Sequence, residues 1–153
     1  MNPERERKRP ADDDPEGGWT FIETIVVIGI VLLLTSSVGF MAFRYLEKAK
    51  VVSARSQIET FALALDSYYL DCGRYPTAEQ GLGALWEKPV QEPVPAGWNG
   101  PYLSKKIPGD PWGGAYEYIV PGKAGLPFGI RSLGADGREG GEGNDADVQS
   151  WED

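Results

Sequence analysis

Histidine is absent from the 153-residue chain, and cysteine occurs once, at Cys72. Without histidine the chain cannot build a Ser-His-Asp triad, a Cys-His nucleophile or a zinc site with a histidine ligand. A lone cysteine excludes an internal disulfide and a metal site made of several cysteines. Positive charge is also scarce, because 15 Lys and Arg face 23 Asp and Glu, for a formal net charge of −8. Such a chain repels a phosphate backbone, so the composition predicts no nucleic-acid partner.

The apolar residues are concentrated in one segment near the N-terminus. From Thr24 to Phe43 the chain has 20 consecutive residues without a charge, bounded by Glu23 and Arg44. At about 1.5 Å per helical residue this run is about 30 Å long, the thickness of the hydrocarbon core of a bilayer. So small a domain has no interior that could surround a core helix of this length. A signal peptide would have a shorter apolar region followed by small residues, whereas bulky residues follow here. The run therefore predicts a membrane-spanning helix.

Glu23 lies at the head of this span. A charge inside the apolar layer costs about 2.5–3.5 kcal/mol on insertion scales and is rare without a partner. In one interpretation Glu23 marks the membrane edge, where its charge stays in water and favours the N-terminal end of the helix. In the other, the chain is cleaved after Gly18, and the new ammonium group of Trp19 pairs with Glu23 of another subunit.

Residues 18–28, Gly-Trp-Thr-Phe-Ile-Glu-Thr-Ile-Val-Val-Ile, resemble the N-terminal signature of the type IV pilin and pseudopilin superfamily. The resemblance implies that residues 1–18 are a leader, which a prepilin peptidase removes after Gly18 on the cytoplasmic side before it methylates Trp19. Glu23 would then act in assembly. Basic residues are equally numerous on the two sides of the span, so charge alone does not orient it. The resemblance orients it in a bacterial inner membrane, with the N-terminus cytoplasmic and the C-terminal domain periplasmic.

No proline interrupts residues 19–75, so we expect one helix from about Thr20 to Asp71. Its first part, residues 19–43, would lie in the membrane or in the core of a filament. Its second part, residues 44–72, is amphipathic, and Gly73 supplies a stop. The apolar stripe of this second part has three- and four-residue spacing and would pack on the globular domain; its members are Ala54, Ile58, Phe61, Leu65 and Tyr69.

Residues 73–153 are predicted to form the globular domain. Residues 77–80, Thr-Ala-Glu-Gln, fit a capping box that opens a short helix through about Trp86. Residues 115–120 and 126–132 are predicted strands, separated by a Pro-Gly turn, and Pro127 suggests a sheet edge. The expected fold class is α+β and type IV pilin-like, with a long N-terminal helix packed on a small antiparallel sheet.

Several of these segments are similar to the major pseudopilins of bacterial type II secretion systems. They are residues 69–81, 99–102, 110–113, 116–118 and 132–137, together with the acidic run that ends in Trp151. The resemblance implies a structural subunit and not an enzyme. It would polymerise into a periplasmic pseudopilus that drives export of folded proteins across the outer membrane. The implied partners are further copies of the chain, minor pseudopilins, the inner-membrane secretion platform and the prepilin peptidase.

The segment from Leu133 to Trp151 is acidic and rich in glycine. Runs of this kind are usually solvated tails. Two features favour an ordered loop: its five glycines allow tight turns that present carbonyls, and Trp151 is too large an apolar residue to leave in solvent. Calcium binds about six to eight oxygens from carboxylates and carbonyls, and this segment supplies both. An EF-hand is excluded, because Arg138 and Gly140 stand where its pattern requires Asp or Asn.

The pseudopilin family binds calcium in the corresponding loop, so the resemblance implies a Ca²⁺ site over residues 133–151. Its ligands would be the carbonyl of Leu133, the carboxylate of Asp136, and Asp145, Asp147 or both. A further carbonyl would come from residues 140–143. Many pilins clamp this region with a disulfide, which a chain with one cysteine cannot form. A calcium ion that binds only the folded loop would take that stabilising role.

Two other functions remain open at the level of sequence. The chain could be a subunit of another filament of the superfamily, a type IV pilus or a DNA-uptake pseudopilus. It could also be a monomeric calcium-binding domain that uses the helix as an anchor. An enzyme is disfavoured, because nothing in the sequence places two carboxylates across a cleft in matched environments.

Overall fold

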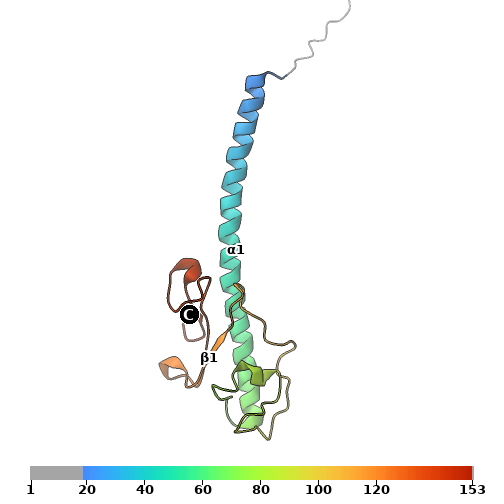
Figure 1. The fold of residues 1–153 in the computed structure, drawn as a ribbon, viewed down its shortest axis with the longest axis vertical. Coiled ribbons are helices and arrows are strands. Elements are labelled where there is room, and N and C mark those ends of the chain that lie inside the picture. Colours follow the sequence, from blue (N-terminus) through green and yellow to red (C-terminus); the bar gives the residue numbers. More distant parts are fainter. Residues whose placement is uncertain (1–18, 153) are drawn as a thin grey trace, which may run out of the picture. The chain divides into compact units, whose positions relative to one another are not determined.

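The computed structural model describes residues 19–152. Helix α1 comprises Phe21–Cys72 and has 52 residues, which confirms the predicted long helix. The remaining elements are the 3-10 helix η1 (Leu82–Leu85), strand β1 (Glu117–Ile119), η2 (Lys123–Gly125), strand β2 (Gly129–Ser132), η3 (Gly143–Asp145) and strand β3 (Val148–Gln149) (Figure 1). The predicted leader, with Gly18 at its end, lies outside the described residues.

The chain divides into two units, residues 1–41 and 42–153, and α1 contributes to both. In the described part of the first unit, large apolar side chains of α1 are exposed, for example Phe21 and Leu33 at 82% and 74%. Among residues 19–152, α1 is the one helix long and apolar enough to cross a membrane. An uninterrupted apolar surface of this kind must be covered by lipid or by protein. The helix therefore fits a membrane anchor.

The second half of α1 provides one wall of the core. Ala54, Ile58, Phe61 and Leu65 are buried, as the stripe predicts. The prediction for Tyr69 is wrong: the stripe continues through Tyr68, which is fully buried, while Tyr69 is 45% exposed. Tyr68 follows Leu65 by three residues, a spacing that keeps both side chains on the same face of the helix. The other buried apolar residues come from η1 and the sheet and are Leu82, Ala84, Leu85, Tyr116, Ile130 and Val148.

The predicted helix stop and the predicted capping box are both present where α1 ends. Gly73 has a φ of 72°, and its N–H donates to the carbonyl of Tyr69 at 2.8 Å, so this glycine terminates the helix. In the capping box, Thr77 N–H donates to Gln80 Oε1 at 3.1 Å, and Gln80 N–H donates to Thr77 Oγ1 at 3.3 Å. The helix expected after the box is instead a turn followed by η1. Gly81, with a φ of 58°, interrupts the helical path.

The three strands form an antiparallel sheet in the order β1-β2-β3. In its register Arg131 of β2 lies opposite Glu117 of β1 and Gln149 of β3. The sequence did not predict β3, which has two residues. The predicted edge at Pro127 is wrong, because β2 is the central strand; Pro127 precedes it and so removes no ladder hydrogen bond.

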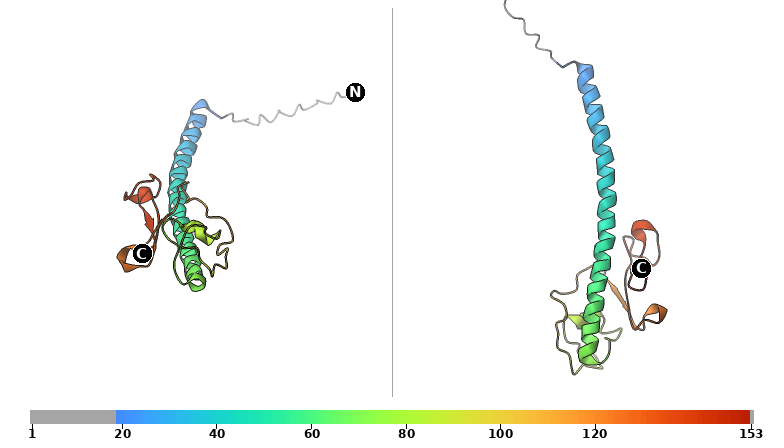
Figure 2. Two further views of the ribbon diagram at one scale, coloured as in Figure 1. Left: turned by 60° about the horizontal axis from the view of Figure 1, so that its bottom comes forward. Right: turned by 180° about the vertical axis from the view of Figure 1, so that it is seen from behind.

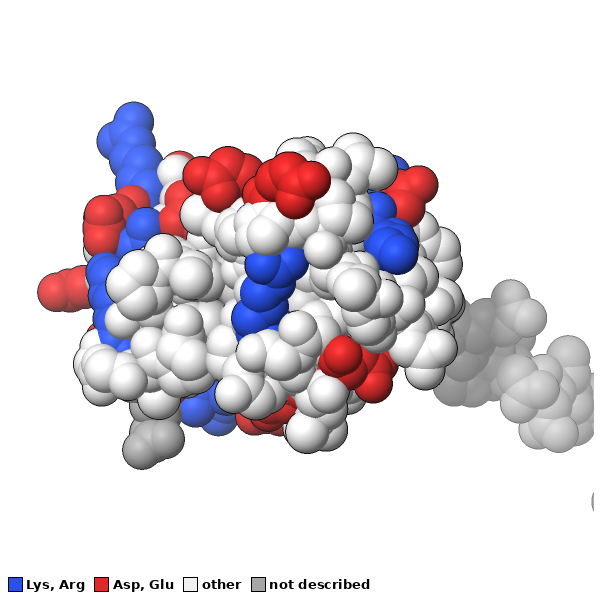
Figure 3. Space-filling view, turned by 90° about the horizontal axis from the view of Figure 1, so that it is seen from below, with Lys and Arg blue, Asp and Glu red and all other residues white. Residues whose placement is uncertain are grey.

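The segment from β1 to the C-terminus lies beside the second half of α1, and η1 lies at the C-terminal end of that helix (Figures 1 and 2). Seen from this end, acidic and basic side chains are interspersed among uncharged ones (Figure 3). Of the residues visible on this face, the basic ones form no continuous patch.

Candidate functional sites in the first helical turn and the acidic loop

Thr20 and Glu23 form a capping box at the start of α1. The backbone N–H and the hydroxyl of Thr20 each donate to Glu23 Oε2 at 3.3 Å, and Glu23 N–H donates to Thr20 Oγ1 at 3.2 Å. These bonds satisfy N–H groups that have no partner within the helix. The role of Thr20 was not predicted from the sequence, although Thr-Phe-Ile-Glu has the spacing of this motif. The first interpretation of Glu23, as a group that favours the helix N-terminus, thus has a geometric basis.

The capping box leaves Glu23 accessible. Both Glu23 and Trp19 are exposed, Trp19 at 72%. Both intrachain bonds end on Oε2, so Oε1 accepts no hydrogen bond from the residues that the structure describes. The carboxylate is oriented by its own chain and can still accept a donor from another molecule.

The acidic segment is an ordered loop that folds back on itself. All five of its glycines have positive φ, at residues 134, 137, 140, 141 and 143. At Gly134 a Cβ atom would lie 2.8 Å from the carbonyl oxygen of Ala146, so only glycine allows this close approach. The N–H of Ala135 donates to the carbonyl of Asn144 at 3.1 Å and ties the two ends of the loop together.

Trp151 is partly buried and packs against β2, in agreement with the expectation that it is not left in solvent. A Cβ atom on Gly129 would lie 2.7 Å from Trp151 Cζ3, so the indole rests directly on the backbone of β2. Lys123 Nζ lies 5.2 Å from the centroid of the Trp151 ring, within the range of a cation–π contact. The C-terminal end of the loop is therefore held by the domain.

Asp147 has the most unusual environment of the predicted metal ligands. Its side chain is 3% exposed, and its Oδ2 accepts from Gly140 N–H at 3.2 Å. Its Oδ1 is buried and has no hydrogen-bond partner within residues 19–152. A buried carboxylate oxygen without a partner is costly, and a hard cation such as Ca²⁺ is a suitable partner for it. This environment fits the predicted metal site.

The other predicted ligands are less constrained. Asp136 is exposed, and its Oδ1 accepts from the N–H of Arg138 at 3.0 Å. Asp145 is exposed, and Leu133 is half-buried at the end of β2. Within residues 19–152, no three acidic side chains converge into a preformed metal cluster. The geometry thus favours Asp147 over Asp145 where the sequence left the choice open.

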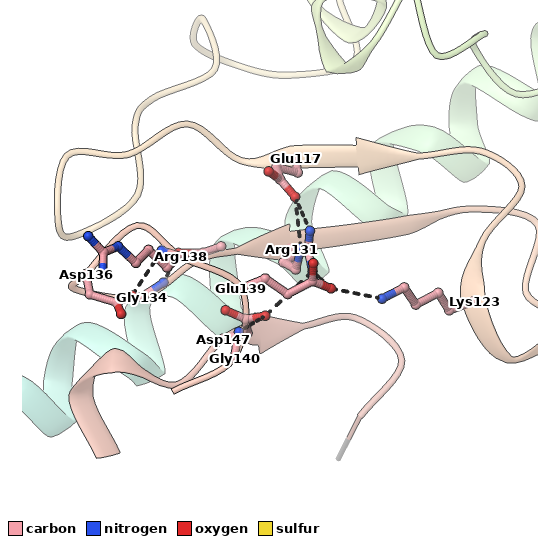
Figure 4. Close-up of polar contacts among 10 residues, drawn as sticks. Glu117, Lys123, Arg131, Gly134, Asp136, Arg138, Glu139, Gly140 and Asp147 are labelled. Atoms are coloured by element: carbon pink, nitrogen blue, oxygen red, sulfur yellow. Dashed lines mark hydrogen bonds and ion pairs between the residues drawn. The ribbon is translucent and has the colours of Figure 1, made fainter. Parts of the chain in front are cut away.

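Arg131 lies between three carboxylates (Figure 4). Its Nη2 is 2.7 Å from Glu117 Oε2, and its Nη1 is 2.7 Å from Glu139 Oε1 and 3.7 Å from Asp147 Oδ2. Hydrogen bonds from Arg131 lower the pKa of Glu139, and the Lys123 ammonium at 3.6 Å lowers it further. Arg131 was not among the residues predicted from the sequence. The sequence feature that could have indicated it is that Arg131 is the only basic residue in the predicted strand 126–132.

A buried aspartate fixes the point where the loop begins. Asp110 Oδ1 accepts from Gly114 N–H at 2.7 Å and from Trp112 N–H at 3.1 Å. The Ser132 hydroxyl, at the end of β2, donates to Asp110 Oδ2 at 2.5 Å and accepts from Gly134 N–H at 3.4 Å. The turn at residues 110–114 therefore positions the chain on both sides of Leu133.

Comparison with known sequences places the chain in a family. The family model described as Type II secretion system (T2SS), protein G matches residues 41–151. The chain is 45% identical over 137 residues to Type II secretion system core protein G of Pseudomonas aeruginosa, covering 90% of this chain and 96% of that one. It is 42% identical over 134 residues to the protein of the same name from Vibrio cholerae, covering 88% and 90%.

A structural comparison gives the same result. The crystal structure of the major pseudopilin from the type 2 secretion system of enterohaemorrhagic Escherichia coli matches with a TM-score of 0.60 and 38% identity. The match covers 68% of this chain and 88% of that one. With its long apolar helix and three-stranded antiparallel sheet, the chain belongs to the protein G family of type II secretion systems, the major pseudopilins.

Proposed function

We propose that the chain is a structural subunit, without enzymatic activity, that polymerises into the periplasmic pseudopilus of a type II secretion system and so drives export of folded proteins across the outer membrane. The observation that carries this proposal is the first half of α1, whose apolar side chains are exposed and whose first turn contains the oriented carboxylate of Glu23. Lipid covers this surface in the stored subunit, and neighbouring copies cover it in the filament. A head-to-tail contact that does not close into a ring generates such a filament.

Processing would prepare the chain for assembly. A prepilin peptidase cleaves after Gly18 and methylates Trp19, and the Trp19 ammonium of one copy then meets Glu23 of another. The free Oε1 of Glu23 and the exposure of Trp19 support this pairing. Two charges that are poorly solvated within an apolar filament core neutralise each other only in the correct register, so the pair specifies how the copies stack.

The second part of the proposal is calcium binding by the acidic loop. The ligands are the Leu133 carbonyl, Asp136 and Asp147, with Asp145 as a further carboxylate and one carbonyl from residues 140–143. The buried Oδ1 of Asp147, which has no hydrogen-bond partner in the described part of the chain, supports this assignment. When bound, calcium supplies a crosslink between the beginning and the end of the loop. At a hundredfold excess over its Kd, an ion that binds only the folded state stabilises it by about 2.7 kcal/mol.

The family and the exposed apolar helix support the proposed location. The N-terminus lies in the cytoplasm, α1 crosses the inner membrane, and the C-terminal domain lies in the periplasm. The partners are other copies of the chain, minor pseudopilins, the inner-membrane secretion platform and the prepilin peptidase. The alternative function is a monomeric calcium-binding domain for which α1 is only an anchor.

Assembly of a Glu23→Leu variant separates these functions. In cells that carry the secretion apparatus, the wild-type chain should form filaments, visible by electron microscopy of sheared material. E23L should stay in the membrane at a normal level and form none. A helix that is only an anchor does not need a charge at this position. The proposal would be contradicted if wild-type cells formed no filaments, or if E23L assembled as well as the wild type.

A further inference from the structure

We propose that Arg131 is the internal counter-cation of the acidic loop. In the metal-free chain its guanidinium balances Glu139 and Asp147 and keeps the loop folded, and its positive charge weakens the binding of calcium. Arg131 would thus set both the metal-free stability of the loop and its calcium affinity. This inference rests on the proposed calcium site.

The position of Arg131 fits this role. It lies in β2, the central strand, and its side chain is only 11% exposed. Its carboxylate partners come from three segments: Glu117 from β1, Glu139 from the acidic loop and Asp147 from the residue before β3. One guanidinium therefore connects the sheet to the loop (Figure 4). Planar guanidinium groups are suited to such multiple contacts.

The two oxygens of Asp147 have different environments. Its Oδ2 faces the Arg131 guanidinium at 3.7 Å and accepts from Gly140 N–H at 3.2 Å, whereas its Oδ1 has no hydrogen-bond partner among the described residues. A cation bound by Oδ1 would share the Asp147 carboxylate with Arg131. Because two cations on one buried carboxylate repel each other, removal of the arginine charge should strengthen calcium binding.

The same charge has the opposite effect on the metal-free loop. Without Arg131, Glu117 and Asp147 would have no ion-pair partner among the described residues, and Glu139 would keep only Lys123 at 3.6 Å; the Asp147 side chain is nearly fully buried. A buried charge that loses its partner is strongly destabilising. A merely structural cross-strand pair between Arg131 and Glu117 makes a different prediction: stability would fall equally with and without calcium, and the calcium affinity would not change.

Calcium titration and thermal unfolding of the full chain in detergent micelles test the inference. Arg131→Met removes the charge and keeps most of the side-chain volume, and Arg131→Lys keeps the charge. Arg138→Met is the control, because Arg138 lies next to Glu139 in the acidic loop, is exposed and has no ion pair in the described part of the chain. R131M should lower the calcium Kd about tenfold, equivalent to about 1.4 kcal/mol. It should also lower the Tm in EDTA, while R131K and R138M keep a Kd close to that of the wild type.

The outcomes separate the inference from the calcium proposal. If calcium does not raise the Tm of the wild type, the calcium site is wrong and the inference fails with it. If calcium stabilises the wild type but R131M binds it no more tightly, or R138M binds it as tightly as R131M does, the site stands and the role of Arg131 is refuted.

A second pair of variants applies even if R131M does not fold. Glu139 is 67% exposed, so Glu139→Gln should fold, and it leaves the Arg131 charge less neutralised. E139Q should raise the calcium Kd several-fold more than Glu142→Gln does, since Glu142 lies in the same loop and has no ion pair within the described residues. Equal effects of E139Q and E142Q would contradict the inference.

Discussion

The carboxylate of Glu23 accepts two hydrogen bonds from Thr20, both at 3.3 Å and both on Oε2. Glu23 therefore caps its own helix, and its Oε1 accepts no hydrogen bond from the other described residues. The two interpretations of Glu23 are compatible, because a capping box orients the carboxylate before any partner arrives. Each function can be removed separately by substitution.

We expect Thr20→Ala and Glu23→Gln to affect assembly differently. T20A removes the cap and costs about 1 kcal/mol at the first turn of α1, but it keeps the charge. E23Q keeps an oxygen that can accept in a capping box and loses the charge. T20A should therefore form filaments at a reduced or normal yield, and E23Q should form few or none, as measured by sedimentation of sheared filaments. If E23Q assembles as well as the wild type, Glu23 is only a cap.

Removal of calcium should lower the Tm of the full chain in detergent micelles, and added Ca²⁺ should restore it. Asp147→Asn should abolish most of this difference, because Asp147 supplies the buried oxygen without a partner. Asp145→Asn is the comparison variant: Asp145 is an exposed further carboxylate of the proposed site, so D145N should lose less of the calcium response than D147N does. Thermal scans by tryptophan fluorescence measure both variants. A calcium response that is lost in D145N and kept in D147N would reverse the assignment.

Gly134→Ala should destabilise the acidic loop more than Gly137→Ala. Both positions have a φ of 65°, so both substitutions cost about 1–2 kcal/mol in backbone strain. The Cβ atom at residue 134 would also lie 2.8 Å from the Ala146 carbonyl, whereas residue 137 has no atom within 4 Å. Overpacking of this kind adds about 1–3 kcal/mol. Denaturant unfolding measures the difference, and equal losses of stability would show that the loop is not closed at Gly134.

The domain should lose stability in alkali because of its buried tyrosines. Burial raises the pKa of Tyr68 and of Tyr116 to about 12, and the Asp110 charge adds to the effect on Tyr116. In the unfolded chain a phenol has a pKa of about 10. The folded state thus binds more protons above this pH, so the stabilisation is complete below about pH 10 and is lost as the pH rises through about 12.

Tyr68→Phe tests this dependence. The Tyr68 hydroxyl is buried without a hydrogen-bond partner in the described residues, so its removal should leave the Tm at pH 7 unchanged or slightly higher. The loss of stability between about pH 10 and 12 should be shallower in Y68F than in the wild type, as followed by near-UV circular dichroism. A Y68F curve parallel to that of the wild type would show that Tyr68 does not titrate on unfolding.

Features that depend on local spacing were predictable from the sequence. The apolar run and the absence of proline indicated α1, and the Thr77–Gln80 box and the Gly73 stop have the expected hydrogen bonds. Features that depend on contacts between distant segments were not predictable. Strand β3 has two residues and exists only because it pairs with β2.

In the candidate sites too, residues whose role depends on contacts between distant segments could not be predicted from the sequence. Asp145 and Asp147 were both candidate ligands in the sequence, and only the burial of the Asp147 side chain distinguishes the two. The role of Arg131 depends on tertiary contacts: the sheet register places it beside Glu117, and the acidic loop places Glu139 next to it. Neither contact can be predicted from local spacing. Thr20 is the exception, because its spacing from Glu23 could have been read as a capping box.

The most direct test of the assembly mechanism is the mass of the chain purified from native cells, together with its N-terminal residue. If Glu23 pairs with a new ammonium group, the mature protein has 135 residues, the 153 of the full sequence less the 18 of the leader, and begins with methylated Trp19. A chain that keeps its first 18 residues and stays dispersed as single copies would contradict the account.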